Sequence, residues 1–273
     1  MIKTPIGIFD SGYGGLTILK EIKASLPDYD YIYLGDNARA PYGPLPYETV
    51  YQNTLQCVEW FFEQGCTLVI LACNTASAKA LRTIQQNDLP GIDPSKRVLG
   101  VIRPTSEVIG NYTKSDHIGI MATVGTVQSG SYLLETEKFF PNISITQEAC
   151  PEWVELAEAG KHLSPEADAP VKEHINKILS KDGKIDTLLL ACTHYPLLMD
   201  KIKQFTPPEV AVIEQGKIIA ESLVGYLERH PEIAERCSRS GKISFYTTGD
   251  KADFNGHASL FFGEKLEAAQ IKL

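Results

Sequence analysis

The chain has 273 residues, 43% of them hydrophobic and 22% charged, and its 26 Lys and Arg against 34 Asp and Glu give a formal net charge of −8. This length can bury a large core, in one domain or in two. The acidic balance argues against a surface that binds the nucleic-acid backbone. No apolar run approaches the length of a membrane span and no charged-then-apolar leader opens the sequence, so we expect a cytoplasmic protein without a membrane or nucleic-acid partner.

The first half of the chain alternates apolar runs of strand length with stretches of helical periodicity. One buried strand ends at Asp10 and Ser11 and leads into a glycine loop, and residues 37–47 are expected to form an irregular loop because they include three prolines. Strands that alternate with helices predict a parallel sheet covered on both faces. The expected strands lie within 6–12, 30–36, 66–73 and 97–102, and the expected helices within 16–26, 48–65 and 74–86.

The same pattern restarts in the second half. Thr123 stands where the first half has Asp10, and the following cysteine comes after a similar interval: 63 positions from Asp10 to Cys73, and 69 from Thr123 to Cys192. We interpret this as an internal duplication. The expected elements are a strand, a loop and a helix in each of 117–140 and 144–160, helices at 165–180 and 216–229, and strands at 185–192, 210–215 and 243–250.

These patterns predict an α/β fold of two similar doubly wound parallel-sheet domains, related by a pseudo-twofold axis, with the active site in the cleft between them. The first domain would comprise residues 1–101 plus 213–273, and the second residues 102–212. The segment after the expected strand at 210–215, which includes the helix at 216–229, is too short for a domain of its own, so we expect it to fold back onto the first.

The segments "LVILACNTASA" and "TLLLACTHYPLL" carry matching cysteines, Cys73 and Cys192, each at the point where a strand ends. Ligands of open parallel sheets lie beyond the carboxyl ends of the strands. We therefore expect one cleft to be lined by the side chains at these ends: Asp10, Ser11, Asp36, Cys73, Asn74, Thr75, Thr123, Cys192, Thr193 and His194.

The cofactor motifs that this architecture often carries are missing. In "DSGYGGL", Thr17 replaces the last glycine of the dinucleotide fingerprint, and no P-loop motif occurs. The six cysteines form neither a C-x-x-C pair nor a zinc-type spacing with histidine, so we expect no metal, no cofactor and no disulfide framework. Most of the thiols are expected to be small buried hydrophobes.

Cys73 and Cys192 suit proton transfer, because a helix N-terminus lowers the pKa of a thiol. Asp10 and His194 are the groups expected to set their protonation. One Cys–His pair alone would suggest acyl transfer or hydrolysis. Two facing thiols instead suggest stereoinversion, in which one thiol removes a proton and the other returns a proton to the opposite face. The duplication favours the second chemistry, since a hydrolase needs only one nucleophile.

At these residues the chain resembles the cofactor-independent aspartate/glutamate racemase family over nearly its whole length. The resemblance is carried by six segments in order: "GIFDSGYGGLTILKEI", "YLGDNARAPYG", "LACNTASA", "ATVGTVQSGSY", "ACTHYPLL" and "FYTTGD". It implies an enzyme that interconverts L- and D-glutamate without pyridoxal phosphate or metal and supplies D-glutamate for peptidoglycan. It also implies a homodimer.

The resemblance further implies that Cys73 takes the α-proton of D-glutamate and Cys192 that of L-glutamate, with Asp10 and His194 tuning them. Glu155 is a candidate assistant on the Cys192 side. The positions that match substrate-binding residues are Asp10, Ser11, Tyr42, Gly43, Asn74, Thr75, Thr193 and His194, and the further candidate contacts are Thr123 and Thr126. Asp36 could serve the site or cap its loop.

Three places depart from the family's usual pattern, namely Arg103 with Thr105, Ala191, and the run "IEQG" at 213–216. None of them is a proton-transfer group. Two alternatives stay open at this point: a racemase acting on aspartate, and a two-lobed amino-acid binding protein without catalysis. The first predicts racemisation of aspartate, and the second predicts binding without exchange of the α-hydrogen.

Overall fold

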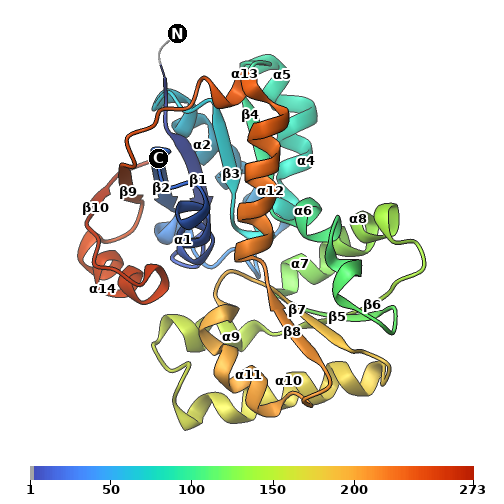
Figure 1. The fold of residues 1–273 in the computed structure, drawn as a ribbon. Coiled ribbons are helices and arrows are strands. Elements are labelled where there is room, and N and C mark those ends of the chain that lie inside the picture. Colours follow the sequence, from blue (N-terminus) through green and yellow to red (C-terminus); the bar gives the residue numbers. More distant parts are fainter. Residues whose placement is uncertain (1–2) are drawn as a thin grey trace.

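The computed structural model describes residues 3–273 and consists of two parallel sheets, each flanked by helices (Figure 1). The larger sheet has the order β10-β9-β2-β1-β3-β4 and the smaller one β6-β5-β7-β8. The strands are β1 Ile6–Asp10, β2 Tyr31–Gly35, β3 Leu68–Leu71, β4 Arg97–Gly100, β5 His117–Ala122, β6 Ser144–Ala149, β7 Thr187–Ala191, β8 Ala211–Glu214, β9 Ile243–Thr247 and β10 Ala268–Gln270.

Every ladder within both sheets is parallel, and the order β2-β1-β3-β4 of the first sheet recurs as β6-β5-β7-β8 in the second. The predicted fold class is therefore confirmed. Chain order also matches, because in each unit the cysteine follows the third strand of the unit, β3 or β7.

The helices connect the strands and cover the sheets. They are α1 Leu16–Ser25, α2 Tyr47–Glu63, α3 Asn74–Lys79, α4 Leu81–Thr83, α5 Leu89–Ile92, α6 Ile102–Ser106, α7 Val124–Ser129, α8 Ser131–Phe139, α9 Pro151–Glu158, α10 Asp168–Lys181, α11 Met199–Phe205, α12 Gly216–Arg229, α13 Pro231–Ala234 and α14 Lys251–Phe262, with short 3-10 turns between some of them. The single helix predicted over 74–86 is interrupted at Ala80 and continues as α4 and a π-helical turn, Ile84–Asp88. Helix α14 was not predicted.

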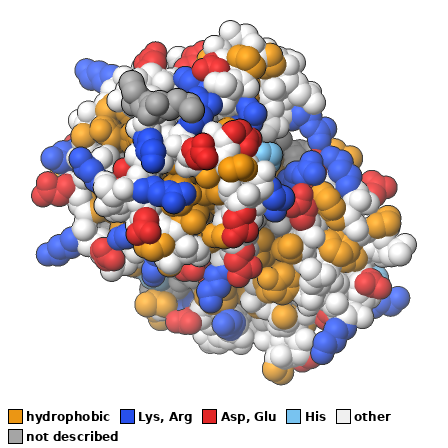
Figure 2. Space-filling model, turned by 45° about the horizontal axis from the view of Figure 1, so that its top comes forward, with side chains coloured by type: hydrophobic (Ala, Val, Ile, Leu, Met, Phe, Trp, Pro, Cys, Tyr) orange, Lys and Arg blue, Asp and Glu red, His pale blue; other side chains and the backbone are white. Residues whose placement is uncertain are grey.

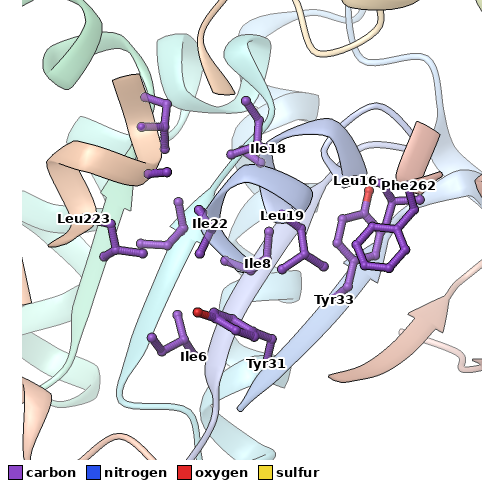
Figure 3. Close-up of a cluster of buried hydrophobic side chains, with 14 of the residues drawn as sticks. Ile6, Ile8, Leu16, Ile18, Leu19, Ile22, Tyr31, Tyr33, Leu223 and Phe262 are labelled. Carbon is purple, nitrogen blue, oxygen red and sulfur yellow. The ribbon is translucent and has the colours of Figure 1, made fainter. Parts of the chain in front are cut away.

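The central strands β1, β2 and β3 of the first sheet are buried at every position, and apart from Asp10 at the end of β1 they contain only hydrophobic residues and glycine. Ile6 and Ile8, two residues apart on β1, point to the same face and pack among α1 and α12 (Figure 3). Phe9 points to the other face and packs with Phe61 of α2. Burying one such side chain stabilises the fold by about 1.5–3 kcal/mol, so the two layers fix the sheet and the strand ends that extend from it.

The chain passes between the two units twice, at α6 after β4 and at the junction of β8 with α12. Helix α12 then packs against α1, and β9 pairs with β2. In Figure 1 both crossings lie between the two sheets. Segments far apart in the sequence thus meet at the boundary of the units.

No helix within residues 3–273 is long and apolar enough to cross a membrane. On the face shown in Figure 2, lysine and arginine side chains are interspersed with aspartate and glutamate.

Candidate active site

The carboxyl ends of four central strands meet between the units. Asp10 ends β1, Cys73 follows β3, Thr123 follows β5 and Cys192 follows β7. Hydrogen bonds join the two sides here: Thr193 Oγ1 donates to Asp10 Oδ2 at 3.3 Å, and the hydroxyls of Thr75 and Thr123 lie 2.8 Å apart. All of these residues are buried, so the structure brings the predicted strand ends together in a site shielded from water.

Cys73 caps the N-terminus of α3. Its Sγ accepts a hydrogen bond from the backbone N–H of Ala76 at 3.5 Å and lies 3.5 Å from Ser11 Oγ. Burial, and after it the nearby Asp10 carboxylate, raise the pKa of the Cys73 thiol to about 12. The helix N-terminus alone would lower this pKa, so the expectation from sequence had the sign wrong: loss of solvation outweighs the helix dipole. Cys73 rests as a thiol that can give up a proton.

Cys192 has a different partner. Its Sγ lies 3.9 Å from His194 Nδ1, and His194 Nε2 lies 2.9 Å from Glu158 Oε1. Burial alone would lower the pKa of His194, but the interactions with Cys192 and Glu158 outweigh burial and raise it to about 10. His194 is therefore an imidazolium at neutral pH, and this cation lies directly beside the Cys192 sulfur.

Asp10 lies between the two thiol loops. Its Oδ1 accepts from the backbone N–H of Gly12 at 2.9 Å, and its Oδ2 accepts from Thr193. Burial raises the pKa of Asp10, while the His194 charge acts in the opposite direction. Asp10 is thus held by backbone and hydroxyl donors, and it acts on Cys73 as a neighbouring charge.

The glycine loop after β1 lies directly against the second thiol loop. A Cβ at Gly14 would lie 2.3 Å from Thr193 Oγ1 and 2.6 Å from His194 Nδ1. Only a residue without a side chain allows the backbone to approach this closely. The loop of the first unit therefore helps to fix His194 of the second.

A sequence profile of the Asp/Glu/Hydantoin racemase family matches residues 16–223. The chain belongs to this family. It is 37% identical, over 96% of its length and 97% of the relative's, to the glutamate racemase of Ruegeria sp. (strain TM1040). Among solved structures it resembles the glutamate racemase isoform RacE1 of Bacillus anthracis, with a TM-score of 0.89 and 32% identity over 99% of this chain and 98% of that one. The glutamate racemase of Francisella tularensis, solved with D-glutamate, gives a TM-score of 0.87 and 29% identity, covering 99% and 98% of the two chains.

The acidic partner of His194 in this racemase-family chain is not the one expected. Glu155 is exposed on α9, and the carboxylate that reaches His194 is Glu158, one helical turn further on. Residues three apart share a helix face but point in slightly different directions, so only the packed position of α9 selects between them. The sequence analysis named only Glu155, and no local signal in the sequence pointed to Glu158.

The loop that carries Tyr42 and Gly43 is anchored by Asp36. This buried carboxylate accepts hydrogen bonds from Tyr42 Oη, from Arg39 Nε at 2.7 Å and from Thr248 Oγ1 at 2.7 Å. Of the two expectations for Asp36, its contacts fit the loop-capping one. Because the Tyr42 hydroxyl donates its proton to Asp36, it cannot donate the same proton to a substrate.

Two sets of polar side chains complete the site: the hydroxyls of Thr75, Thr123 and Thr126, and the amide of Asn74. Thr75 Oγ1 lies 2.8 Å from Thr123 Oγ1 and 3.5 Å from Thr126 Oγ1, and Thr123 Oγ1 accepts from the backbone N–H of Thr126 as the cap of α7. Asn74, which follows Cys73, is 2% exposed, and its side chain is held by Tyr132 and Gln215. Within residues 3–273, no cluster of three or more His, Cys, Asp or Glu could hold a metal ion.

Proposed function

We propose that this amino-acid racemase interconverts L- and D-glutamate by two-base proton transfer between Cys73 and Cys192. The observation that carries the proposal is the pair of buried thiols at equivalent strand ends of two matching sheets, one beside a carboxylate and the other beside an imidazolium. The substrate is inferred from the relatives, which are named glutamate racemases and align with nearly the whole chain.

In the L-to-D direction the Cys192 thiolate removes the α-proton of L-glutamate, and the C–H electron pair passes into the α-carboxylate as an enediolate. The Cys73 thiol then gives its proton to the opposite face of the α-carbon. One S–H bond forms and the other breaks, so the two thiols exchange protonation states and the reverse reaction starts from Cys73. The assignment of each thiol to one enantiomer rests on the family resemblance.

The surroundings fit this exchange. The imidazolium of His194 lies beside Cys192 and can stabilise negative charge there, while burial and Asp10 favour Cys73 as thiol. The reaction of L-glutamate requires an acid at Cys73 and a base at Cys192, and the two different surroundings suit these two roles. Hydroxyls of Ser11, Thr75 and Thr193 are the donors proposed for the substrate's carboxylates. D-glutamate made in this way would serve peptidoglycan synthesis.

The test measures exchange of the α-hydrogen in deuterated water, together with racemisation by circular dichroism, for both glutamate and aspartate. Wild type is expected to racemise glutamate, and Cys73→Ser and Cys192→Ser to lose about 10²–10⁴-fold in rate. The matched control is Cys237→Ser, which alters a buried thiol outside the site and can keep its hydrogen bond to the Ile233 carbonyl. Wild-type racemisation by either site variant would refute the two-thiol mechanism, and racemisation of aspartate alone would refute the substrate.

The resemblance also led to the expectation of a homodimer, and this stays a prediction, as does the cytoplasmic location expected from the sequence. Sedimentation equilibrium of the purified chain measures its mass directly: about twice the 30.1 kDa of one chain would support it.

A further inference from the structure

Asn74 belongs to a closed ring of hydrogen bonds behind the Cys73 loop. Its Nδ2 donates to Gln215 Oε1 at 2.7 Å, Gln215 Nε2 donates to Tyr132 Oη at 2.7 Å, and Tyr132 Oη donates back to Asn74 Oδ1 at 2.7 Å. Each member therefore donates to one neighbour and accepts from the other. Flipping one amide alone would place two donors or two acceptors face to face, and flipping both would turn Gln215 Oε1 toward Thr105, whose hydroxyl already donates to the Val101 carbonyl.

The ring is anchored where the chain crosses between the units. The second N–H of Gln215 Nε2 donates to Thr105 Oγ1 at 2.8 Å, and Thr105 Oγ1 donates to the Val101 carbonyl at 2.7 Å. Thr105 lies in the first crossing and Gln215 at the second, while Tyr132 comes from α8 of the second unit. Thr105 and Gln215 are also two of the positions at which the sequence departs from its family's usual pattern.

Every side chain in this network is buried: Asn74 is 2% exposed, Gln215 3%, and Thr105 and Tyr132 are fully buried. A buried polar group without a partner is costly, so the members hold one another in place. After the ring is closed, one N–H of the Asn74 amide remains without a partner among the hydrogen bonds of the described residues. That N–H belongs to the residue next to the Cys73 thiol.

We propose that Gln215 and Tyr132 are positioning residues, which orient the Asn74 amide so that its remaining N–H binds a carboxylate of the substrate beside Cys73. The inference rests on the proposed function, since it assigns these residues to the binding of glutamate. It also ties the amide to both crossings between the units, so the donor keeps its place only while the two units keep their relative position.

The first variant is Tyr132→Phe, which opens the ring and leaves the ring volume nearly unchanged. We expect about a tenfold lower kcat/KM, because the loss of one oriented hydrogen bond to a charged group has about this effect. Most of the change should fall on KM, since the carboxylate is bound in both the ground state and the transition state. The second variant, Gln215→Met, removes the ring's other link and should act in the same direction.

The matched control is Tyr31→Phe. Tyr31 is as deeply buried, and its hydroxyl donates to the Leu26 carbonyl at 2.7 Å, in the core of the first unit away from the site. It loses the same chemical group and should lose similar thermal stability, but its kinetic constants should match wild type. A purely structural role for Tyr132 would make the two variants alike, and this outcome would overturn the proposal.

Two double variants test whether the ring acts as a unit through Asn74. In an Asn74→Ala background, adding Tyr132→Phe should leave kcat/KM within about twofold, because the amide that it orients is gone. Tyr132→Phe combined with Gln215→Met should cost no more than the worse single variant. A full tenfold effect of Tyr132→Phe in the Asn74→Ala background would overturn the positioning role while leaving the proposed function intact. A wild-type chain that racemises no glutamate would overturn both.

Discussion

The pairing of His194 with Glu158 should set the alkaline limit of activity. Glu158→Gln keeps the shape and one hydrogen bond to His194 Nε2 but removes the negative charge. A hydrogen bond to a charged group contributes about 1.5–3 kcal/mol and a neutral one about 0.5–1.5, so about 1–2 kcal/mol of stabilisation of the imidazolium is lost. This corresponds to about one pKa unit. The pKa of His194, about 10 in the native chain, should therefore fall to about 9.

The consequence for the rate follows from the role of the imidazolium. Above the pKa of His194 the positive charge beside Cys192 is lost, and with it the stabilisation of negative charge during proton transfer, so kcat/KM falls. The alkaline limb of the profile should shift down by about one unit in Glu158→Gln, with little change below pH 8. L- and D-glutamate have equal free energies in water. The shift must therefore be the same for kcat/KM in both directions.

The assay is racemisation followed by circular dichroism between pH 6 and 11, started from each enantiomer. Glu155→Gln is the control, because Glu155 is exposed one turn earlier on the same helix and should leave the profile unchanged. An alkaline limb that stays in place in Glu158→Gln, or moves equally in Glu155→Gln, would show that this ion pair does not govern Cys192.

Two further changes test the packing of the site. Gly14→Ala places a methyl group against Thr193 and His194, so kcat/KM should fall by about 100-fold. Gly256→Ala is the control, because a Cβ there meets nothing within 4 Å, and it should leave kcat/KM unchanged in the same assay. Asp36→Asn weakens the anchor of the loop that carries Gly43 and should lower the free energy of unfolding by about 1–3 kcal/mol and raise KM. Urea titration and initial rates measure these effects, with the exposed Asp200→Asn as control; an Asp36→Asn variant as stable as this control would contradict the anchoring role.

The alternation of strands and helices, repeated once, was enough to predict two parallel sheets with their strand ends facing one cleft. This succeeded because a parallel sheet requires a crossover after each strand, and hydrophobic periodicity reports both elements. Matching positions after matching strands then selected Cys73 and Cys192 as candidates, and their catalytic role stays a prediction. These features depend on local pattern and on the general geometry of the fold.

What could not be predicted depends on contacts between distant residues. Gln215 and Asn74 are hydrogen-bonded although they lie 141 positions apart in the sequence, and no local sequence pattern predicts such a pair. The choice of Glu158 over Glu155 depends on how α9 packs, and the raised pKa of Cys73 depends on the extent of burial. Helix α14 buries Phe254, Ala258, Phe261 and Phe262 on one face, but the exposed Leu260 lies off that face and blurs the apolar stripe in the sequence.

The recurrence of one strand order in both sheets carries a geometric consequence for the two halves of the site. A twofold rotation that exchanges the faces of a planar carbanion also exchanges two of its three substituents. The two thiols can be related by such a rotation, because each of them contacts only one face of the planar carbanion. The groups that bind the carboxylates and the ammonium cannot be related by this rotation, because each substituent of a single glutamate points in only one direction. Divergence of Asp10 from Thr123, and of Asn74 from Thr193, is therefore what a duplicated fold needs in order to hold an unsymmetrical molecule between two equivalent acids.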